Sequence, residues 1–593
     1  MAKKYIDIMD TTFRDGFQSV FGGRVLMQDF FPAVEAAKEA GITHFEFGGG
    51  ARFQSLFFYL QENAFDMMDK FRSIVGPDAN LQTLARGINT VMLDTGSRDL
   101  VDLHAKMFSK HGVTTIRNFD ALNDVQNLEY SAACIKKYGL KHEVVVTMMD
   151  LPPKCEGAHD VAFYEKTLRN ILNSGLSFDS VAFKDASGTS SPQKVYDTIK
   201  MARNLLGDSV HIRLHTHETA GVSVACYLAA LEAGADGIDL AAAPVSGGTS
   251  QPDILTMLHA VKGKNFDLGG LEIDKILKYE EVLSDCLKDY FMPPEATQVL
   301  PLIPFSPMPG GALTANTQMM RDNGTLGKFG EVIKAMQEVV ERGGYGTSVT
   351  PVSQFYWQQA YANVMFGPWE QIAPGYGKMV LGYFGKTPVA PDPHIVELAS
   401  RKLKLEPTQE NPLDIADRDE KKSIAYWTKR LEEENIETTE ENIFIAAACD
   451  EKGIAFLKGN GPLNVRKLSN ETKSEGKMMS ANGNYTVVVN GVKYSVQVAE
   501  GDGANLEITK IESAPGAASV SGEGTPINAV VNGTVWKILV KEGDSVSAGQ
   551  TVVILEAMKM EIEVKAPAAG KVTSVVATQG SSVDEGTTLL FIA

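Results

Sequence analysis

Residues able to bind a metal ion follow two expected strands in the first half of the chain. Asp15 lies in the segment Asp10–Ser19, directly after an apolar run, while His215 and His217 close a second run. Because residues i and i+2 of an extended segment point to the same face, both imidazoles can bind one ion. A carboxylate from Asp15 would complete three ligands and leave a position open, as in catalytic metal sites. These residues therefore predict a metal centre.

A second group of residues that could do chemistry lies near the C-terminus. Lys559 stands between two segments, GTVWKILVKEGDSVSAGQTVVIL and GKVTSVVATQGSSVDEGTTLLFI, which repeat each other at an offset of 37 residues. Alternating β-branched and polar residues with glycines at the turns predict short strands. Two related sets of strands predict a flattened barrel with a pseudo-two-fold axis. Lys559 would lie on the turn that joins the halves, presented to solvent and to a modifying enzyme.

This arrangement resembles the biotinyl carrier domains of biotin-dependent enzymes, whose motif Glu-Ala-Met-Lys-Met stands here at Glu556–Met560. The resemblance implies biotin bound covalently to Lys559, attached by a biotin protein ligase. A lipoyl domain has the same barrel with an Asp before the lysine, so the flanking Met558 and Met560 favour biotin. An unmodified surface lysine is the ordinary alternative.

Composition indicates a large enzyme of several domains, with 593 residues and 44% apolar content. The net charge of −18 argues against binding to nucleic acid. The five cysteines form no CxxC pair, which favours a reducing compartment over disulfides or a thiolate zinc site. We expect no signal peptide and no membrane-spanning run. We therefore predict a cytoplasmic protein, peripheral to a membrane only through partner subunits.

The elements that would position these residues begin with a barrel. Over residues 1–265, short apolar runs alternate with helical patterns, as expected for an α/β protein with a (β/α)₈ TIM barrel. An open doubly wound sheet is the alternative, but no Gly-rich dinucleotide fingerprint follows the first strand. Catalytic groups collect at the C-terminal ends of barrel strands, where Asp15 and His217 would lie. The expected strands are Tyr5–Asp10, Thr43–Phe47, Leu81–Arg86, Thr114–Phe119, Glu143–Met148, Ser180–Lys184, His211–His215 and Gly237–Ala241.

Three further blocks follow the barrel. Residues 266–468 carry long helical patterns and predict a mainly α domain. Residues 469–525 predict a linker that contains a hairpin around Asn490-Gly491 and a tether of small residues. Residues 526–593 form the all-β biotinyl domain. A tether raises the local concentration of the biotin at a distant site without fixing its position, which suits a swinging arm.

The barrel and helical blocks resemble the carboxyltransferase domains of pyruvate carboxylase, of the oxaloacetate decarboxylase α subunit and of transcarboxylase. With the carrier, the resemblance covers most of the chain and keeps the domain order of the family. The shared motifs are TTxRDxxQS at Thr11–Ser19, KDxxG at Lys184–Gly188, HxHxTxG at His215–Gly221, SGxTSQP at Ser246–Pro252, MPGG at Met308–Gly311, VTPxSQ at Val349–Gln354 and GKTP at Gly385–Pro388.

The resemblance implies that Asp15, His215, His217 and Lys184 bind a divalent ion, with zinc expected first and manganese or cobalt as alternatives. In the family the lysine is carbamylated, which converts a cation into an anionic oxygen ligand. The alternative is an unmodified Lys184 paired with Asp185.

The resemblance also implies substrate contacts and a reaction. Arg14, Gln18 and Arg86 match positions that hold the substrate's carboxylate and oxo group, and a guanidinium suits a planar carboxylate. Thr350 matches the proton shuttle between biotin and the substrate methyl, and Ser353 lies near the biotin ureido group. The implied reaction is carboxyl transfer between carboxybiotin and pyruvate or oxaloacetate, with an enolate stabilised by the metal and the arginines.

The sequence departs from the family in the first third of the barrel. Phe17 replaces a His, and Phe47–Phe53 replaces a WGGATFD segment. A PWERL-like segment is replaced at Ala64–Met68, and the family's GY is missing from Gly87–Met92. These departures weaken the inference to pyruvate more than the inference to carboxyl transfer.

Two other classes of protein remain open at this point. A metal-dependent aldolase or acyl-CoA lyase shares the barrel, but Lys184, Thr350 and Lys559 together argue against it. A non-catalytic biotin scaffold would not need a complete metal set. No ATP-grasp-like region or phosphate-binding loop is found, so we expect a separate biotin carboxylase subunit, or sodium-pumping membrane decarboxylase subunits, in a homo-oligomeric assembly. We favour pyruvate carboxylation, because no segment suits docking in a bilayer.

Overall fold

The computed structural model describes residues 3–468, 483–489, 492–498, 509–510, 524–557 and 560–593. The chain divides into two compact units, Met1–Val465 and Arg466–Ala593. The finer domain boundaries expected at residues 265 and 525 remain predictions. Among the described residues, none of the helices combines the length and the apolar character needed to cross a bilayer.

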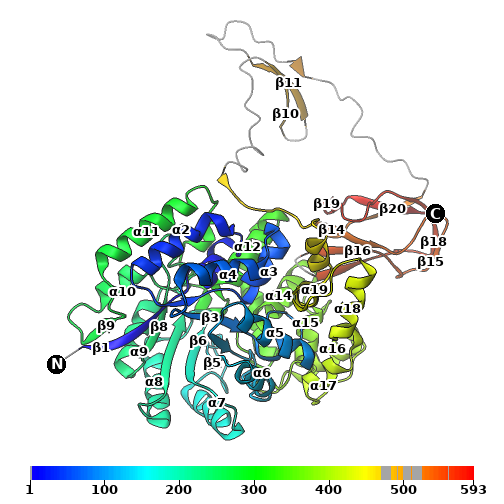
Figure 1. The fold of residues 1–593 in the computed structure, drawn as a ribbon. Helices are drawn as coiled ribbons and strands as arrows, with labels where there is room; N and C mark the ends of the chain where they lie inside the picture. The colour runs from blue at the N-terminus through cyan, green and yellow to red at the C-terminus, as the bar shows by residue number, and fades with distance from the viewer. Residues whose placement is uncertain (1–2, 469–482, 490–491, 499–508, 511–523, 558–559) are drawn as a thin grey trace. The chain divides into compact units, whose positions relative to one another are not determined.

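A closed barrel of eight parallel strands forms the first part of unit 1 (Figure 1). The strands pair in chain order from β2 to β8, and β1 closes the ring because it pairs with both β8 and β2. The expected TIM barrel is therefore confirmed and the open sheet is wrong. The strands are β1 (Lys4–Asp10), β2 (His44–Glu46), β3 (Asn80–Ala85), β4 (Thr115–Asn118), β5 (Lys141–Thr147), β6 (Ser180–Asp185), β7 (His211–Thr216) and β8 (Gly237–Leu240).

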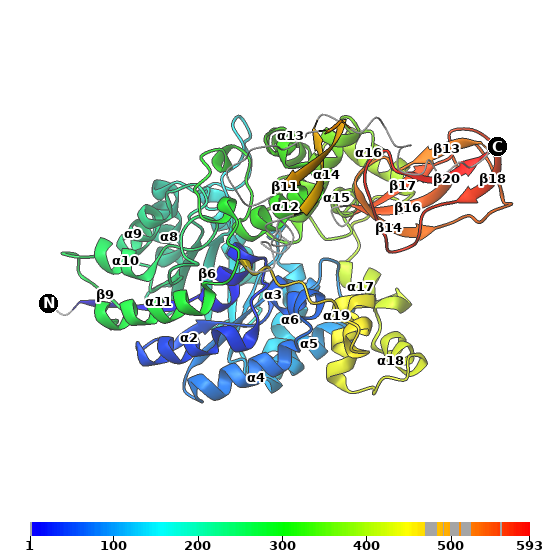
Figure 2. The same ribbon diagram turned by 90° about the horizontal axis from the view of Figure 1, so that it is seen from above.

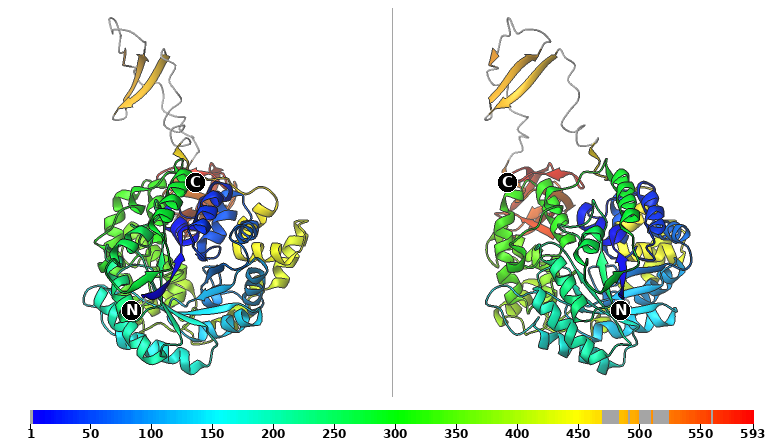
Figure 3. Two further views of the ribbon diagram at one scale, coloured as in Figure 1. Left: turned by 60° about the vertical axis from the view of Figure 1, so that its left-hand side comes forward. Right: turned by 90° about the vertical axis from the view of Figure 1, so that its left-hand side faces the viewer.

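A short ninth strand, β9 (Phe266–Leu268), pairs with the beginning of β1 outside the ring. Its three residues are too few for a period-2 pattern, so the sequence did not predict it. Helices surround the strands, as Figure 3 shows. They are α2 (Met27–Glu39), α4 (Ala64–Val75), α5 (Arg98–Lys110), α6 (Gln126–Lys137), α7 (Val161–Ser174), α8 (Pro192–Leu206), α9 (Ser223–Ala233), α10 (Ile254–Ala260) and α11 (Ile273–Leu287).

Local sequence explains where these helices begin and end. The carboxylate of Asp160 accepts a hydrogen bond from the backbone N–H of Phe163 and caps α7, which ends at the left-handed Gly175. Ser191 caps α8, whose first residue is Pro192, a residue suited to a first turn that has no partner for its N–H. Each helix then buries its apolar face against the strands.

Short helical turns occupy several loops at the C-terminal ends of the strands. They place the residues between β1 and α2, and between β2 and α4, in compact loops beside the barrel mouth. These elements are η1 (Thr12–Gly16), α1 (Phe17–Phe21), α3 (Gly50–Ser55), η2 (Leu56–Leu60) and η3 (Gly87–Asn89).

The rest of unit 1 is helical, as expected, and its helices pack in series from α13 to α16. The last helix, α19, returns to the barrel and packs against α5 and η2, where the rings of Phe57 and Phe456 lie 4.9 Å apart. Figure 2 shows α17, α18 and α19 together, apart from α13 and α14. These helices are α12 (Gly310–Asp322), α13 (Phe329–Arg342), α14 (Val352–Phe366), α15 (Pro374–Val380), α16 (Pro393–Leu403), α17 (Pro412–Asp417), α18 (Ile424–Glu433) and α19 (Glu440–Leu457). Shorter turns are η4 (Pro294–Ala296), η5 (Ile303–Phe305), η6 (Leu326–Lys328) and η7 (Glu420–Lys422).

Unit 2 begins with the expected hairpin, in which β10 (Gly483–Val489) pairs with β11 (Val492–Val498). Its turn, Asn490-Gly491, lies outside the described residues. A short strand, β12 (Thr509–Lys510), pairs with β11. The hairpin is therefore confirmed on either side of that turn.

The C-terminal repeat folds into two four-stranded sheets, β13-β20-β18-β15 and β17-β16-β14-β19. Gly533 pairs with Val583, and Gly570, the repeat partner of Gly533, pairs with Val546, the repeat partner of Val583. This reciprocal pairing is the predicted pseudo-two-fold symmetry. The strands are β13 (Thr525–Asn528), β14 (Gly533–Ile538), β15 (Ser545–Val546), β16 (Thr551–Ala557), β17 (Met560–Lys565), β18 (Gly570–Val575), β19 (Ser582–Val583) and β20 (Thr588–Ile592).

Candidate active site

A pocket of about 410 Å³, partly open to solvent, lies at the C-terminal ends of the barrel strands. Loops after β1, β3, β4 and β6, the end of β7, and the segments that lead into α12 and α14 converge on it. Seven of the ten site residues predicted from the sequence line the pocket. Its full lining is Arg14, Asp15, Gln18, Leu84, Arg86, Phe119, Lys184, Ala186, His217, Pro309, Gly311, Ala312, Val349 and Thr350.

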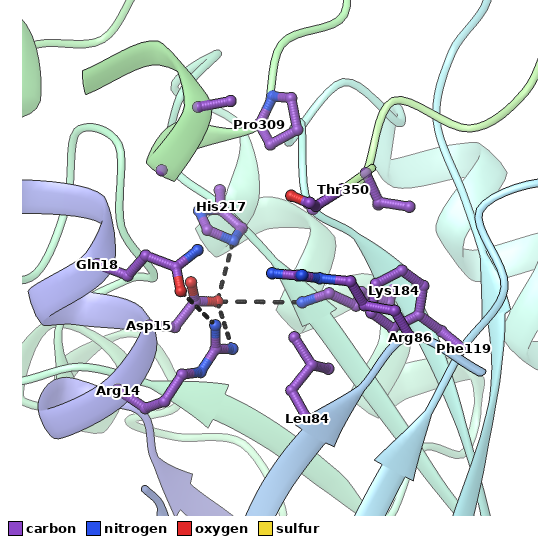
Figure 4. A pocket seen from close by; sticks show the side chains of 14 residues that line it. Arg14, Asp15, Gln18, Leu84, Arg86, Phe119, Lys184, His217, Pro309 and Thr350 are labelled. Carbon is purple, nitrogen blue, oxygen red and sulfur yellow. Dashed lines mark hydrogen bonds and ion pairs between the residues drawn. The ribbon is translucent and has the colours of Figure 1, made fainter. Parts of the chain in front are cut away.

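The structure brings the four predicted metal ligands together. One ligand atom from each of Asp15, His215 and His217 lies within 4.8 Å of the others. The Nζ atom of Lys184 lies 2.7 Å from His215 Nε2 and 4.0 Å from Asp15 Oδ2. Figure 4 shows Asp15 on one side of the pocket, facing Lys184 on the other. Three strands thus supply four groups to one point.

Hydrogen bonds fix the tautomers of both histidines. His217 Nδ1 lies 2.7 Å from the carbonyl oxygen of Thr249, which only accepts, so Nδ1 carries the proton. His215 Nδ1 lies 2.8 Å from Oδ2 of Asp239 and carries the proton for the same reason. The two Nε2 lone pairs therefore face each other at 3.1 Å, beside the carboxylate of Asp15. Such a donor set suits a divalent transition metal ion such as zinc.

The charges of the ligands agree with this interpretation. Burial opposes ionisation of Asp15, but the positive Arg14 beside it holds the pKa of its carboxyl well below the usual value. Burial lowers the pKa of His215, and so does the neighbouring Lys184 amine. At neutral pH the site therefore offers an anionic carboxylate and a neutral imidazole, the forms that bind metal.

Lys184 is not paired with Asp185, the alternative that the sequence left open. Consecutive residues of a strand point to opposite faces, and Asp185 instead accepts hydrogen bonds from the backbone N–H groups of Ser187, Gly188 and Ser190. Burial lowers the pKa of Lys184 to about 8, and Asp15 only partly opposes the shift. The lowered pKa makes the uncharged amine more accessible at neutral pH than that of an ordinary lysine.

The two arginines of the pocket differ in their partners. Arg14 forms ion pairs with Asp15 and Glu46, so its charge is already balanced. The Nη1 group of Arg86 donates to the carbonyl oxygens of Val91 and Met92, and no carboxylate in the described part of the chain forms an ion pair with it. Burial and the nearby Arg14 lower the pKa of Arg86 to about 9. The charge of Arg86 is therefore buried without a neutralising anion among the described residues.

The remaining site residues predicted from the sequence differ in whether they reach the pocket. Gln18 Oε1 accepts from Arg14 Nη1 and from the backbone N–H of Arg52, which leaves the amide nitrogen as its donor. Thr350 lines the pocket just before α14. Ser353, one turn further on, is buried, does not line the pocket, and its hydroxyl has no partner among the described residues. Lys559 lies outside the described residues.

Close backbone packing holds the segment that leads into α12 beside the pocket. A Cβ atom at Gly310 would lie 1.6 Å from the carbonyl oxygen of Thr249. Only glycine fits at this distance, so the first turn of α12 rests directly on the loop that holds His217. This contact explains Gly310 of the MPGG motif.

Three residues near the ligands were not assigned a role from the sequence. Gln251 Nε2 lies 3.0 Å from both Asp15 Oδ2 and His217 Nε2, and Glu46 and Asp239 bind Arg14 and His215. The acids could have been noticed as polar residues inside apolar strands. Gln251 lies in the SGxTSQP motif, but the orientation of its side chain toward the metal ligands depends on the tertiary structure.

The residues that depart from the family pattern do not line the pocket, but Arg52, Val91 and Met92 form hydrogen bonds with Gln18 and Arg86, which do. The guanidinium of Arg52 donates to the carbonyl oxygens of Gly23 and Val25 and lies 5.6 Å from the ring of Phe17. Ala64–Met68 begins α4. Phe17 and Ala64–Met68 are absent from the lining of the pocket.

Comparison with known proteins extends these observations. Family profiles described as "HMGL-like", "Conserved carboxylase domain" and "Biotin-requiring enzyme" match residues 5–282, 303–498 and 523–592. A pyruvate carboxylase subunit of Methanocaldococcus jannaschii is 31% identical over 94% of each chain. The methylmalonyl-CoA carboxyltransferase 5S subunit of Propionibacterium freudenreichii is 28% identical over 84% of this chain and 97% of its own. The carboxyl transferase domain of Rhizobium etli pyruvate carboxylase shares the fold, with a TM-score of 0.69 at 21% identity over 95% of this chain and 89% of that one.

Proposed function

The chain belongs to the family of biotin-dependent carboxyltransferases that includes the Methanocaldococcus jannaschii pyruvate carboxylase subunit, and we propose that it transfers a carboxyl group between biotin and pyruvate or oxaloacetate. One observation carries this proposal: a buried donor set for a metal ion lies at the same pocket as an arginine without an anion. A lyase or a biotin scaffold is less favoured, because the two family profiles beyond the barrel describe a carboxylase and a biotin-requiring enzyme.

The pocket suits a small 2-oxo acid. Arg86 supplies the cation that the substrate's carboxylate would neutralise. Arg14 and the amide nitrogen of Gln18 offer hydrogen-bond donors to the oxo group. Leu84 and Phe119 add apolar surface for a methyl group. A monocarboxylate fits this set better than a dicarboxylate, because Arg14 is already neutralised.

The metal site would be completed by Lys184. Its uncharged amine adds to CO₂, forming a nitrogen–carbon bond and releasing a proton, which leaves an anionic oxygen where a cation stood. Asp15, His215, His217 and the modified Lys184 would then hold zinc, or manganese or cobalt. Such an ion, when bound, polarises the oxo group and stabilises an enolate.

Proton movement is proposed for Thr350. Its hydroxyl accepts the proton from the acceptor's methyl group while it gives its own to the biotin ureido nitrogen. Contact of Ser353 with the ureido group stays a prediction, because its hydroxyl, although without a partner among the described residues, is buried and does not line the pocket.

Replacing Thr350 by alanine is expected to lower carboxyl transfer by about 10²–10⁴-fold, because a positioned proton relay supplies that much. Exchange of labelled pyruvate into oxaloacetate measures the change. Metal content and biotin content should stay normal. Thr350→Ser, which keeps the hydroxyl, serves as the matched control and should retain most activity. An alanine variant with about a tenth or more of the normal rate would exclude the relay.

The proposed direction is pyruvate carboxylation with a separate biotin carboxylase subunit, since relatives named as one subunit of a pyruvate carboxylase match this chain over almost their full length. The native complex should form oxaloacetate from pyruvate, ATP and bicarbonate, and avidin should block the reaction. If the native complex were found only in membranes and broke down oxaloacetate faster with sodium, the physiological reaction would instead be decarboxylation. Activity only with another oxo acid or an acyl thioester would show that the acceptor is wrong while carboxyl transfer stands.

A further inference from the structure

The interior of the barrel below the metal ligands is ionic rather than apolar. Arg117 on β4, Glu143 on β5, Arg213 on β7 and Asp239 on β8 are all buried to within 2% of full burial. Barrel interiors are usually filled by branched apolar side chains. Buried charges cost free energy unless each is paired. Four of them beneath one pocket therefore require an explanation from their contacts.

The contacts centre on Asp239. Its Oδ2 atom accepts from His215 Nδ1 at 2.8 Å and from Nη1 of Arg117, and its Oδ1 atom accepts from Nη1 of Arg213 at 3.1 Å. Arg117 is held in turn by Glu143 through its Nε group. The carboxylate is thus fixed from three sides, and β7 and β8 are neighbours in the barrel. Its geometry is set by the scaffold and not by a loop.

One hydrogen-bond donor and one acceptor lie beside His215 Nδ1. Nη1 of Arg117 lies 3.3 Å from this nitrogen and is a donor, whereas Asp239 at 2.8 Å is an acceptor. If Arg117 donated to Nδ1, the imidazole proton would move to Nε2 and cover the lone pair that faces Asp15 and His217. Asp239 prevents this, because it takes the N–H of Arg117 and the N–H of His215 together.

We propose that Asp239, held in place by Arg117, is a positioning residue of the metal centre: it fixes the tautomer and ring orientation of His215 and so raises the affinity for the metal. The inference rests on the proposed function, since it assumes that the cluster binds a metal ion. A carboxylate behind a ligating imidazole also makes the metal-facing nitrogen more basic. His217 lacks such a carboxylate and uses the Thr249 carbonyl instead, so the two histidines are not equivalent.

The test is the affinity of the full-length protein for Co²⁺, measured by chelator competition and by the visible spectrum of the bound ion. Asp239→Asn keeps the shape but removes the anion, so Arg117 is free to donate to Nδ1. We expect the affinity to fall by about 10–100-fold. Asp7→Asn is the matched control. It removes a carboxylate that pairs with Arg213, while Arg213 keeps its hydrogen bonds to Asp239 and to the backbone of Ile238. Arg117 and His215 keep all their partners, so this variant should bind Co²⁺ as the unaltered protein does.

Three outcomes would overturn the inference. Asp239→Asn could bind as tightly as the unaltered protein, or Asp7→Asn could lose as much affinity as Asp239→Asn, which would mean a structural role only. Circular dichroism will show whether Asp239→Asn folds. If it does not, Asp239→Glu replaces it, because the longer side chain displaces the imidazole of His215. Unchanged Co²⁺ affinity in Asp239→Glu would then overturn the inference. An unaltered protein that fails to bind Co²⁺ would instead contradict the metal site of the proposed function.

Discussion

His217→Ala is expected to empty the metal centre and to abolish carboxyl transfer. The imidazole contributes one of three ligand atoms that lie within 4.8 Å of one another. Its loss leaves two ligands and the amine of Lys184. The carbonyl oxygen of Thr249 and the amide of Gln251 would also lose a partner in a buried site. Elemental analysis of the purified protein should find no stoichiometric divalent ion.

A control for this prediction lies on the same strand. His211 begins β7, at the end opposite to the metal ligands, and its nearest acid is Asp7 at 3.8 Å. His211→Ala should therefore keep its metal and its activity. Stoichiometric metal in His217→Ala, or equal losses in both variants, would refute the assignment of His217 as a ligand.

Lys559→Arg is expected to remove biotin and all transfer while the metal centre stays intact. The strands around this residue have the expected form, since β16 and β17 pair down to Ala557 and Met560, on either side of Met558 and Lys559. Biotin attachment needs an uncharged amine as nucleophile, and a guanidinium keeps its proton at any physiological pH. Intact-mass measurement should show one biotin per unaltered chain and none in the variant.

A matched control is found a few residues further along. Lys565 ends β17, is exposed and forms an ion pair with Glu563. Lys565→Arg should carry biotin normally, because it changes the same residue type in the same hairpin. Peptide mapping that finds Lys559 unmodified in protein from biotin-replete cells would show that the carrier assignment is wrong.

Much of the fold could be predicted because the patterns are local. A strand buried on both faces is a short apolar run, so all eight barrel strands were found within a few residues of their bounds. The repeat offset of 37 residues predicted the reciprocal pairing of Gly533 with Val583 and of Gly570 with Val546. By contrast, the return of α19 to the barrel depends on contacts across hundreds of residues, which no local pattern encodes.

By itself, the sequence determined which side chains were available to bind a metal ion or to take part in the reaction. The spacing of His215 and His217 predicted a shared face, and the motifs around Asp15, Lys184 and Thr350 predicted that their loops meet. Those inferences follow from residue type, strand period and family resemblance. Asp15, Lys184, His217 and Thr350 line one pocket, and His215 lies beside Asp15 and His217, while the roles of these residues stay predictions.

Only the tertiary structure decided the charge and the orientation of these side chains. Arg14 is neutralised by Glu46 while Arg86 is not, and Asp239 fixes the proton of His215 from the next strand. Proton positions and pKa values depend on distances between atoms and on the loss of water around them. Two arginines or two histidines look alike in a sequence, and the neighbours brought to each by folding give them different chemistry.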